Sequence, residues 1–254
     1  MKITFLGTGA AEGIPAINCQ CEHCRRARKE GPPLTRERNA ILFELPGYNL
    51  LVDTPPDVRD MINRYEVSRL EGIWITHAAY EHVGGIKEFE YWQDRLDLLA
   101  EERLFKIVKR EHWTARLERV MFHIPYYPGA ALYFGEFSIL PFAVRRNVPI
   151  FGFSLKEGDR RVVYTSDTPA RLTNYARCLM RYADLLIVNT PVFQPPKEDH
   201  ITVVEAIALK EEVQAGELIL TYINHRNKPH DELQAYVQNF DGVRVAYDGM
   251  TVEI

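Results

Sequence analysis

Two histidines and a glutamate lie close together in a segment whose residue types and spacing suit a metal centre. His77 follows an apolar run at 72–76, Glu81 and His82 come four and five residues later, and a glycine pair stands at 84–85. Imidazole nitrogens and carboxylate oxygens are common ligands of the divalent ions that polarise substrates or activate water. The segment therefore predicts a buried strand at 72–76 that ends in a loop of metal ligands, followed by a helix.

A second candidate metal site lies near the start of the chain, where three of the four cysteines fall within six residues. Cys19, Cys21 and Cys24 are too few and too clustered for a disulfide framework. Three thiolates this close can hold one tetrahedral ion, most suitably zinc, if a fourth ligand arrives from elsewhere. His23 is the candidate for that ligand within the cluster itself.

The composition indicates one globular α/β domain over residues 1–254. The chain has 254 residues, of which 46% are hydrophobic, and is long enough to bury a large core. Its net charge of −4 leaves no general electrostatic footprint for nucleic acid or for an anionic membrane. No signal-peptide core follows Met1, and no apolar run reaches the roughly 18 residues of a spanning helix. We therefore expect a cytoplasmic protein without a membrane partner.

Alternating strands and helices are expected around the two candidate sites. The expected strands cover residues 2–6, 40–44, 49–52, 72–76, 104–108, 132–145, 150–156, 161–165, 185–188 and 217–222, with two short strands at the end. The expected helices cover residues 55–65, 83–99, 111–120, 202–212 and 231–239, with one more after Pro169. Hairpins followed by strand–helix units, twice over, suit two mixed sheets packed face to face with helices outside.

Six polar motifs occur in an informative order along the chain. They are Thr8-Gly9, Asp53-Thr54, the His77 loop, Ser166-Asp167-Thr168, His200-Ile201-Thr202, and the segment from Leu220 to His225. Together they resemble the metallo-β-lactamase superfamily from residue 1 to about 250, and most of all the branch that contains the cyclic ribose phosphodiesterase of phosphonate breakdown. The resemblance implies an αββα sandwich, a dinuclear metal centre and a homodimer. It also implies that the cysteine cluster is closed by His225 rather than by His23.

The first ion of that dinuclear centre would lose most of its ligands in this chain. The resemblance places its histidines at residues 77, 79 and 146, but Ala79 has no donor and Arg146 is a permanent cation. Only His77 and the bridging Asp167 remain, and two protein ligands rarely hold a divalent ion against water. We expect Arg146, or Arg145 if the alignment slips by one residue, to pair with Asp167 or Glu81 in place of the metal.

The second ion would keep more of its ligands. The resemblance assigns it to residues 81, 82, 167 and 222, where this chain has Glu81, His82, Asp167 and Tyr222 in place of the expected acid, histidine, bridging acid and last histidine. We therefore expect at most one further divalent ion beside the structural zinc, either zinc, manganese or iron. Its candidate ligands are His77, Glu81, His82 and Asp167.

Three functions in different classes remain open. The first is a protein with a degenerate centre that has lost the family hydrolysis and binds a small anionic or phosphate-containing molecule, or a protein partner. The second is a phosphodiesterase-like hydrolase with one ion. The third is an oxygenase, because two histidines and one carboxylate are the ligand set of mononuclear non-haem iron.

Four residues are expected to act on the ligand or to line its site. His200 matches a histidine that approaches the substrate phosphate in the resembling enzyme, where it suits a proton donor. Asn189 stands where that enzyme has an acid, so we expect His200 to lack a carboxylate partner at this position. The four residues are His200, Asp167, Tyr222 and Arg146.

Overall fold

The computed structural model describes residues 1–144, 149–194 and 200–254. One sheet contains β1 (Lys2–Gly7), β2 (Ala40–Leu45), β3 (Tyr48–Val52), β4 (Gly72–Trp74), β5 (Leu96–Ala100), β6 (Met121–Pro125) and β14 (Thr251–Glu253). The other contains β7 (Leu132–Tyr133), β8 (Phe137–Ala143), β9 (Phe151–Glu157), β10 (Arg160–Tyr164), β11 (Leu185–Asn189), β12 (Glu217–Thr221) and β13 (Val243–Val245). The helices are α1 (Glu22–Glu30), α2 (Val58–Arg64), α3 (Tyr80–Val83), α4 (Glu102–His112), α5 (Leu117–Val120), α6 (Asn174–Met180), α7 (Val203–Val213) and α8 (His230–Val237), with the 3-10 helix η1 (Ile86–Tyr91).

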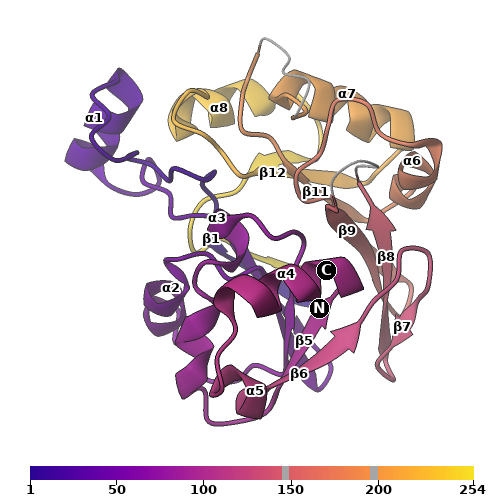
Figure 1. Cartoon of the computed structure of the whole chain (residues 1–254). Helices are drawn as coiled ribbons and strands as arrows, with labels where there is room; N and C mark the ends of the chain where they lie inside the picture. Colours follow the sequence, from indigo (N-terminus) through magenta and orange to yellow (C-terminus); the bar gives the residue numbers. More distant parts are fainter. Residues whose placement is uncertain (145–148, 195–199) are drawn as a thin grey trace.

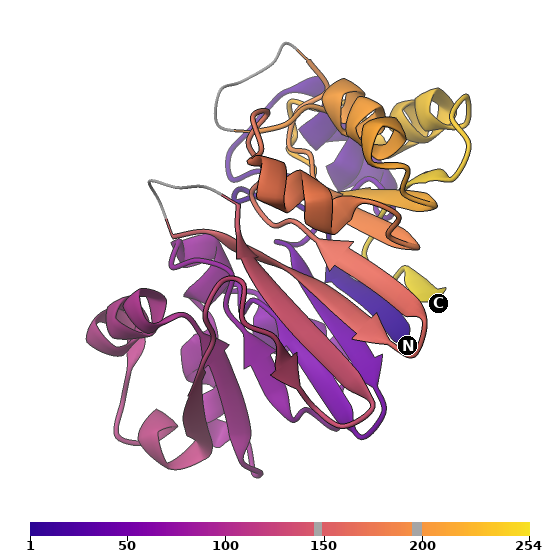
Figure 2. The same cartoon turned by 90° about the vertical axis from the view of Figure 1, so that its right-hand side faces the viewer.

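Within the described residues, both sheets have seven strands and both are mixed. The first runs β14-β1-β2-β3-β4-β5-β6, and its pairs are antiparallel up to β3 and parallel from β3 onward. The second runs β13-β12-β11-β10-β9-β8-β7, parallel from β13 to β10 and antiparallel beyond. Helices α6, α7 and α8 lie along one outer side, and α2, α4 and α5 along the opposite side (Figures 1 and 2). The expected two-sheet α/β sandwich is confirmed.

Aromatic side chains interlock where the two sheets face each other. Phe153 on β9 lies edge to face with Phe43 on β2 and with Trp74 on β4, at ring-centroid distances of 5.6 and 5.1 Å. All three side chains are fully buried. Full burial of one phenylalanine side chain contributes about 1.5–3 kcal/mol, so these contacts hold β4 firmly against the second sheet.

The carboxyl ends of several strands meet at one edge and carry the polar motifs. Strands β3 and β4 are parallel neighbours, as are β10, β11 and β12, and such ends gather at the same side of a sheet. Three residues just beyond these ends have positive φ, namely Asp53 (64°), Ser166 (52°) and Tyr222 (59°). Non-glycine residues in this region cost about 1–3 kcal/mol each and cluster at functional sites. The backbone therefore turns sharply where the polar side chains are presented.

Two expected elements between residues 83 and 108 are wrong. The expected helix at 83–99 is replaced by the short η1 and the strand β5, which pairs in parallel with both β4 and β6. Sheet pairing outweighs the helical preference of its leucines. The expected strand at 104–108 is part of α4, because the Glu101 side chain caps the helix and Leu104 and Val108 face the core one turn apart.

In the described residues, no helix is long and apolar enough to cross a membrane. The longest described helices, α4 and α7, have 11 residues each and carry several charged side chains. A span needs about 20 predominantly apolar residues.

Tyr126 supports the segment that leads into the His77 loop. Its ring stacks on Trp74 at 4.1 Å, and its buried hydroxyl donates to the Ile75 carbonyl at 2.7 Å. We predict that Tyr126→Phe lowers the free energy of unfolding by about 1–3 kcal/mol, because that carbonyl loses a donor. Urea denaturation measures the change. Tyr133→Phe is the control, since Tyr133 is 81% exposed, and an equal effect of both substitutions would contradict the prediction.

Candidate metal centres

His77, His82 and Asp167 converge on one point at the edge where the strands end. Each offers a ligand atom, and these atoms all lie within 4.8 Å of one another. His77 Nε2 lies 3.6 Å from Asp167 Oδ2, and the two imidazole rings are 4.0 Å apart between centroids. All three side chains are buried. Two imidazoles and one carboxylate in this arrangement can hold a divalent ion.

The buried Asp53 sets the orientation of both histidines. Its carboxylate accepts from the Thr76 backbone N–H at 2.9 Å and from Thr76 Oγ1 at 2.8 Å, and it lies 2.7 Å from His82 Nδ1. Thr76 donates its one hydroxyl proton to Asp53. Thr76 Oγ1, which lies 3.0 Å from His77 Nδ1, therefore accepts a hydrogen bond from that ring. The network thus assigns a proton to Nδ1 of both histidines and leaves Nε2 of both as a metal ligand.

The second ring nitrogen of His82, Nε2, is placed where it could bind an ion. His82 Nε2 is buried and makes no hydrogen bond within the described structure. A buried polar atom without a partner is costly, and a bound cation would satisfy it. The donor set and its supporting contacts therefore fit a metal ion.

Charge in this site is balanced between histidines and acids. Burial opposes protonation of His82, but the nearby Asp53, Asp167 and Glu81 carboxylates outweigh it and raise the pKa of His82 to about 9. Burial likewise opposes ionisation of Asp167, but the adjacent histidines lower the pKa of Asp167 below its usual value. Without an ion, His82 is protonated at neutral pH. An ion that binds there has to displace this proton.

Three further expected residues surround the convergence point. The Tyr222 ring lies near His82 and near His200, at centroid distances of 5.6 and 6.3 Å, and its hydroxyl donates to Glu81 Oε1 at 3.4 Å. Burial and the neighbouring carboxylates of Asp167 and Glu81 raise the pKa of Tyr222 well above its usual value, so it remains a phenol. Glu81 is not among the described residues whose donor atoms group within 4.8 Å.

The sequence predicted that Arg146, or its neighbour Arg145, pairs with Asp167 or Glu81. Both arginines lie outside the described residues.

Two further side chains of the site had no predicted role as contacts of its ligands. The sequence marked Asp53 only as part of an ordered motif, although its place after a strand, like that of Asp167, was a usable signal. Asn189 donates from Nδ2 to Asp167 Oδ1 at 3.1 Å. The amide thus contacts the carboxylate directly.

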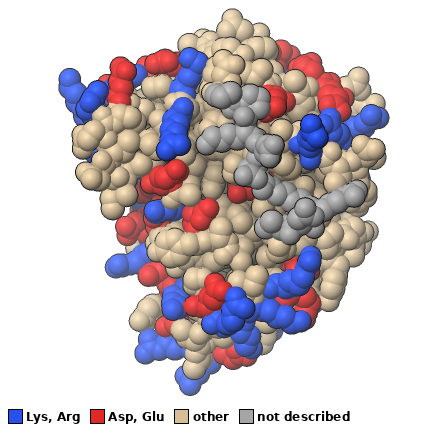
Figure 3. Space-filling model, turned by 45° about the horizontal axis from the view of Figure 1, so that its top comes forward, with Lys and Arg blue, Asp and Glu red and all other residues tan. Residues whose placement is uncertain are grey.

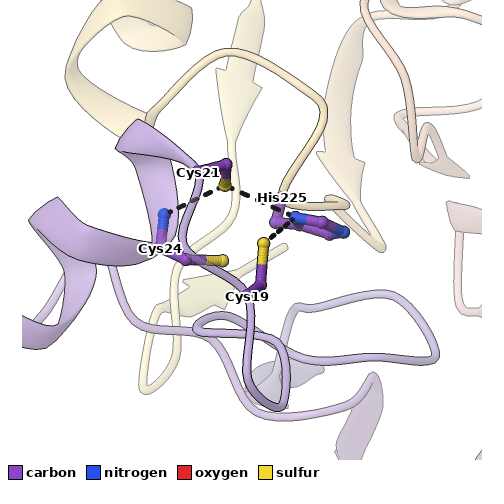
Figure 4. A group of neighbouring side chains, drawn as sticks. All are labelled: Cys19, Cys21, Cys24 and His225. Carbon is purple, nitrogen blue, oxygen red and sulfur yellow. Dashed lines mark hydrogen bonds between the residues drawn. The ribbon is translucent and has the colours of Figure 1, made fainter.

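The cysteine cluster forms a second group of donors (Figure 4). Cys19, Cys21, Cys24 and His225 also have their ligand atoms within 4.8 Å of one another. His225 Nδ1 lies 3.4 Å from the Cys19 sulfur and 3.6 Å from the Cys21 sulfur. A tetrahedral zinc with Zn–S of about 2.3 Å and Zn–N of about 2.05 Å separates sulfur and nitrogen by about 3.6 Å. The spacing therefore matches a zinc site.

His23 supports this group without being one of its donors. Its Nδ1 lies 3.2 Å from the backbone carbonyl of His225, which joins α1 to the turn after β12. Arg28 donates to the Cys19 carbonyl at 2.7 Å and steadies the loop. Burial raises the pKa of the Cys24 thiol to about 12, so without a cation this thiol stays protonated at neutral pH. A bound cation would displace the proton and leave a thiolate.

A protein-family comparison decides the affiliation of the chain. The model of the Beta-lactamase superfamily domain matches residues 48–223, which is more than half of the chain. The chain belongs to the metallo-β-lactamase superfamily. With the octanoyltransferase of Porphyromonas gingivalis (strain ATCC BAA-308 / W83) it shares 24% identity over its whole length, but it covers only 53% of that protein. The chain thus spans about half the length of this relative.

Solved structures support the same fold. A diphosphatase of the PhnP family has a TM-score of 0.86 at 22% identity, with 100% of this chain and 97% of that chain covered. The Zn²⁺-bound PqqB of Methylobacterium extorquens has a TM-score of 0.84 at 20% identity, with both chains fully covered. At these identities the likeness shows the fold alone.

Loss of one cysteine ligand should destabilise the protein. We predict that Cys21→Ser lowers the melting temperature and removes about one zinc per chain, because a metal held by folded ligands adds its binding energy to folding. Calorimetry and elemental analysis measure both changes. Cys178→Ser is the matched control, since Cys178 is exposed and lies outside the group; a melt of Cys21→Ser equal to that of the control would count against the site.

Metal uptake at the histidine site should depend on pH. The pKa of His82 is about 9 without an ion, so below that pH a proton competes with the metal. We predict that the apparent affinity rises by up to about tenfold per pH unit toward pH 9, with release of a proton. Calorimetric titration in buffers of different ionisation enthalpy measures that proton. An affinity that stays constant between about pH 6 and 8 would contradict the assignment.

Proposed function

We propose that this chain carries a structural zinc at the cysteine cluster and a single-ion remnant of a two-metal centre. In this proposal the protein has lost two-metal hydrolysis and binds a small anionic molecule at the remaining ion. One observation carries the proposal: Nε2 of His77 and of His82 are presented together with Asp167, on imidazoles already oriented by Asp53 and Thr76. Such prearranged ligands suit an ion that is kept bound.

The side chains around this point support one ion rather than two. Two-metal hydrolysis uses ions about 3.5–4 Å apart, each with its own ligands. Ala79 offers no donor atom, and Tyr222 remains protonated and donates to Glu81. A phenol that acts as a donor is a poor metal ligand, and the Glu81 oxygen it contacts is already hydrogen-bonded.

Three protein ligands leave coordination positions for an anionic ligand or a water molecule. An ion there would supply Lewis acidity toward a ligand oxygen. Asp53 holds the His82 ring in place, and His200 lies beyond the Tyr222 ring, where it can donate a proton to a bound anion. The chain's own residues thus orient the metal ligands and can protonate the bound anion.

A small ligand also fits the charge of the surface. On the face in Figure 3, the described Lys and Arg side chains are interspersed with Asp and Glu side chains. The net charge is −4. A polyanion such as nucleic acid is usually met by a patch of one sign, so we favour a small anionic molecule as the ligand.

The donor set favours a second candidate function, an iron-dependent oxygenase. Two histidines and one carboxylate with open positions are typical of mononuclear non-haem iron. A relative named "Coenzyme PQQ synthesis protein B" in Methylobacterium sp. (strain 4-46) matches the whole chain at 23% identity. An oxygenase at this site would need iron and dioxygen rather than zinc.

Metal content of protein purified without added metal tests both functions. We expect two ions per chain, of which Cys21→Ser removes one and His82→Ala the other. Zinc at the histidine site supports the first function, and iron supports the oxygenase. A single ion, lost only in Cys21→Ser, would overturn the metal centre at His77 and His82.

Generic phosphodiester hydrolysis should be close to background. We predict that the wild-type protein, supplied with zinc or manganese, hydrolyses bis-p-nitrophenyl phosphate no faster than the His82→Ala variant does. The reason is that one ion cannot stabilise both the attacking and the leaving oxygen. Release of p-nitrophenol measures the rate. Robust turnover that requires metal and disappears in His82→Ala would restore a one-ion hydrolase as the function.

A further inference from the structure

The two oxygens of the Asp167 carboxylate have different surroundings. Oδ1 accepts a hydrogen bond from Asn189 Nδ2 at 3.1 Å, whereas Oδ2 lies 3.6 Å from His77 Nε2. Asp167 is 8% exposed and Asn189 is completely buried. Little water therefore reaches this contact, and the amide controls how the carboxylate is turned.

Asn189 is rigidly placed for this contact. It is the last residue of β11, an entirely buried strand between β10 and β12, and it pairs in register with Thr221. An amide donates a hydrogen bond without bringing a charge into the interior, where a charge has to be compensated. Within the described residues, the carboxylate thus accepts a hydrogen bond from a neutral group.

A similar contact holds the other acid of the site. The Tyr222 hydroxyl, just beyond the end of β12, donates to Glu81 Oε1 at 3.4 Å. Two adjacent strands of the second sheet, β11 and β12, thus each present a neutral donor to one of the two acids beside His77 and His82.

We propose that Asn189 is a positioning residue that engages Oδ1 of Asp167 and so turns Oδ2 toward the metal site beside His77. The inference rests on the proposed single-ion centre. Groups that hydrogen-bond a metal ligand typically change metal affinity by about 10–100-fold when they are removed.

One variant of Asn189 tests the proposal on the full-length protein with its cysteine site loaded. Asn189→Leu keeps the size of the side chain but removes the donor, so we expect the affinity for Co²⁺ to fall by about 10–100-fold. Asn39→Leu is the matched control, since Asn39 is buried and its amide contacts Tyr164 and Thr221 rather than a carboxylate.

The absorption spectrum of bound Co²⁺ provides a readout that a purely structural role would not change. It reports coordination number, so we expect a shift in Asn189→Leu, where Asp167 is free to bind through both oxygens, and none in Asn39→Leu. The spectrum of His82→Ala, which retains only the cysteine site, is subtracted. Unchanged Co²⁺ affinity and an unchanged spectrum in Asn189→Leu would overturn the role of Asn189 alone. Wild-type protein that binds no Co²⁺ outside the cysteine site would overturn the proposed function as well.

Discussion

The contact between Asp53 and the His77 loop is the interaction on which the rest of the site depends. Asp53 is completely buried, and its backbone is in the left-handed conformation. A buried carboxylate without compensating donors would be strongly destabilising. It is satisfied by two donors of Thr76 and by His82. Because β3 and β4 are parallel neighbours, Asp53 and Thr76 leave the sheet side by side. The same hydrogen bonds that make Asp53 tolerable also orient both imidazoles.

The two candidate metal sites are linked through the turn that follows β12. Tyr222 faces the histidine site, and His225, three residues later, belongs to the cysteine group. Between them, Ile223 donates its backbone N–H to the Thr8 carbonyl at 2.8 Å and so ties the turn to the loop after β1. Arg26 on α1 also pairs with Asp231 on α8 at 3.0 Å. A structural ion at the cysteines would therefore stabilise a segment that also shapes the other site.

Among the described residues, two uncharged side chains donate to the acids of the histidine site. Asn189 contacts Asp167, and Tyr222 contacts Glu81. Each contact stabilises a carboxylate without adding a charge that would repel a metal ion nearby. The described site therefore combines three donors that could hold a metal ion with acids that already accept hydrogen bonds.

Local chemistry was readable from the sequence alone, because it depends only on residue type and close spacing. Ala79 cannot ligate a metal in any fold, and three cysteines within six residues are near one another in any backbone. The order of motifs also predicted the two-sheet sandwich, which the structure confirms. The helix expected at 83–99 failed because β5 is stabilised by its neighbours β4 and β6, and no local pattern records that pairing.

The sequence pointed to Asp167 and His225 only through the family resemblance, whereas the tertiary structure decided how the candidate acids and histidines meet. Glu81 precedes His82 in the sequence, yet Asp167, 85 residues later, joins the donor group while Glu81 turns to Tyr222. His23 lies within the cysteine cluster, yet His225 contacts the sulfurs. The contacts of Asp53 and Asn189 likewise required the register of β3 with β4 and of β11 with β12. Sheet register joins segments far apart in the chain, and it depends on the packing of the whole core rather than on any single segment.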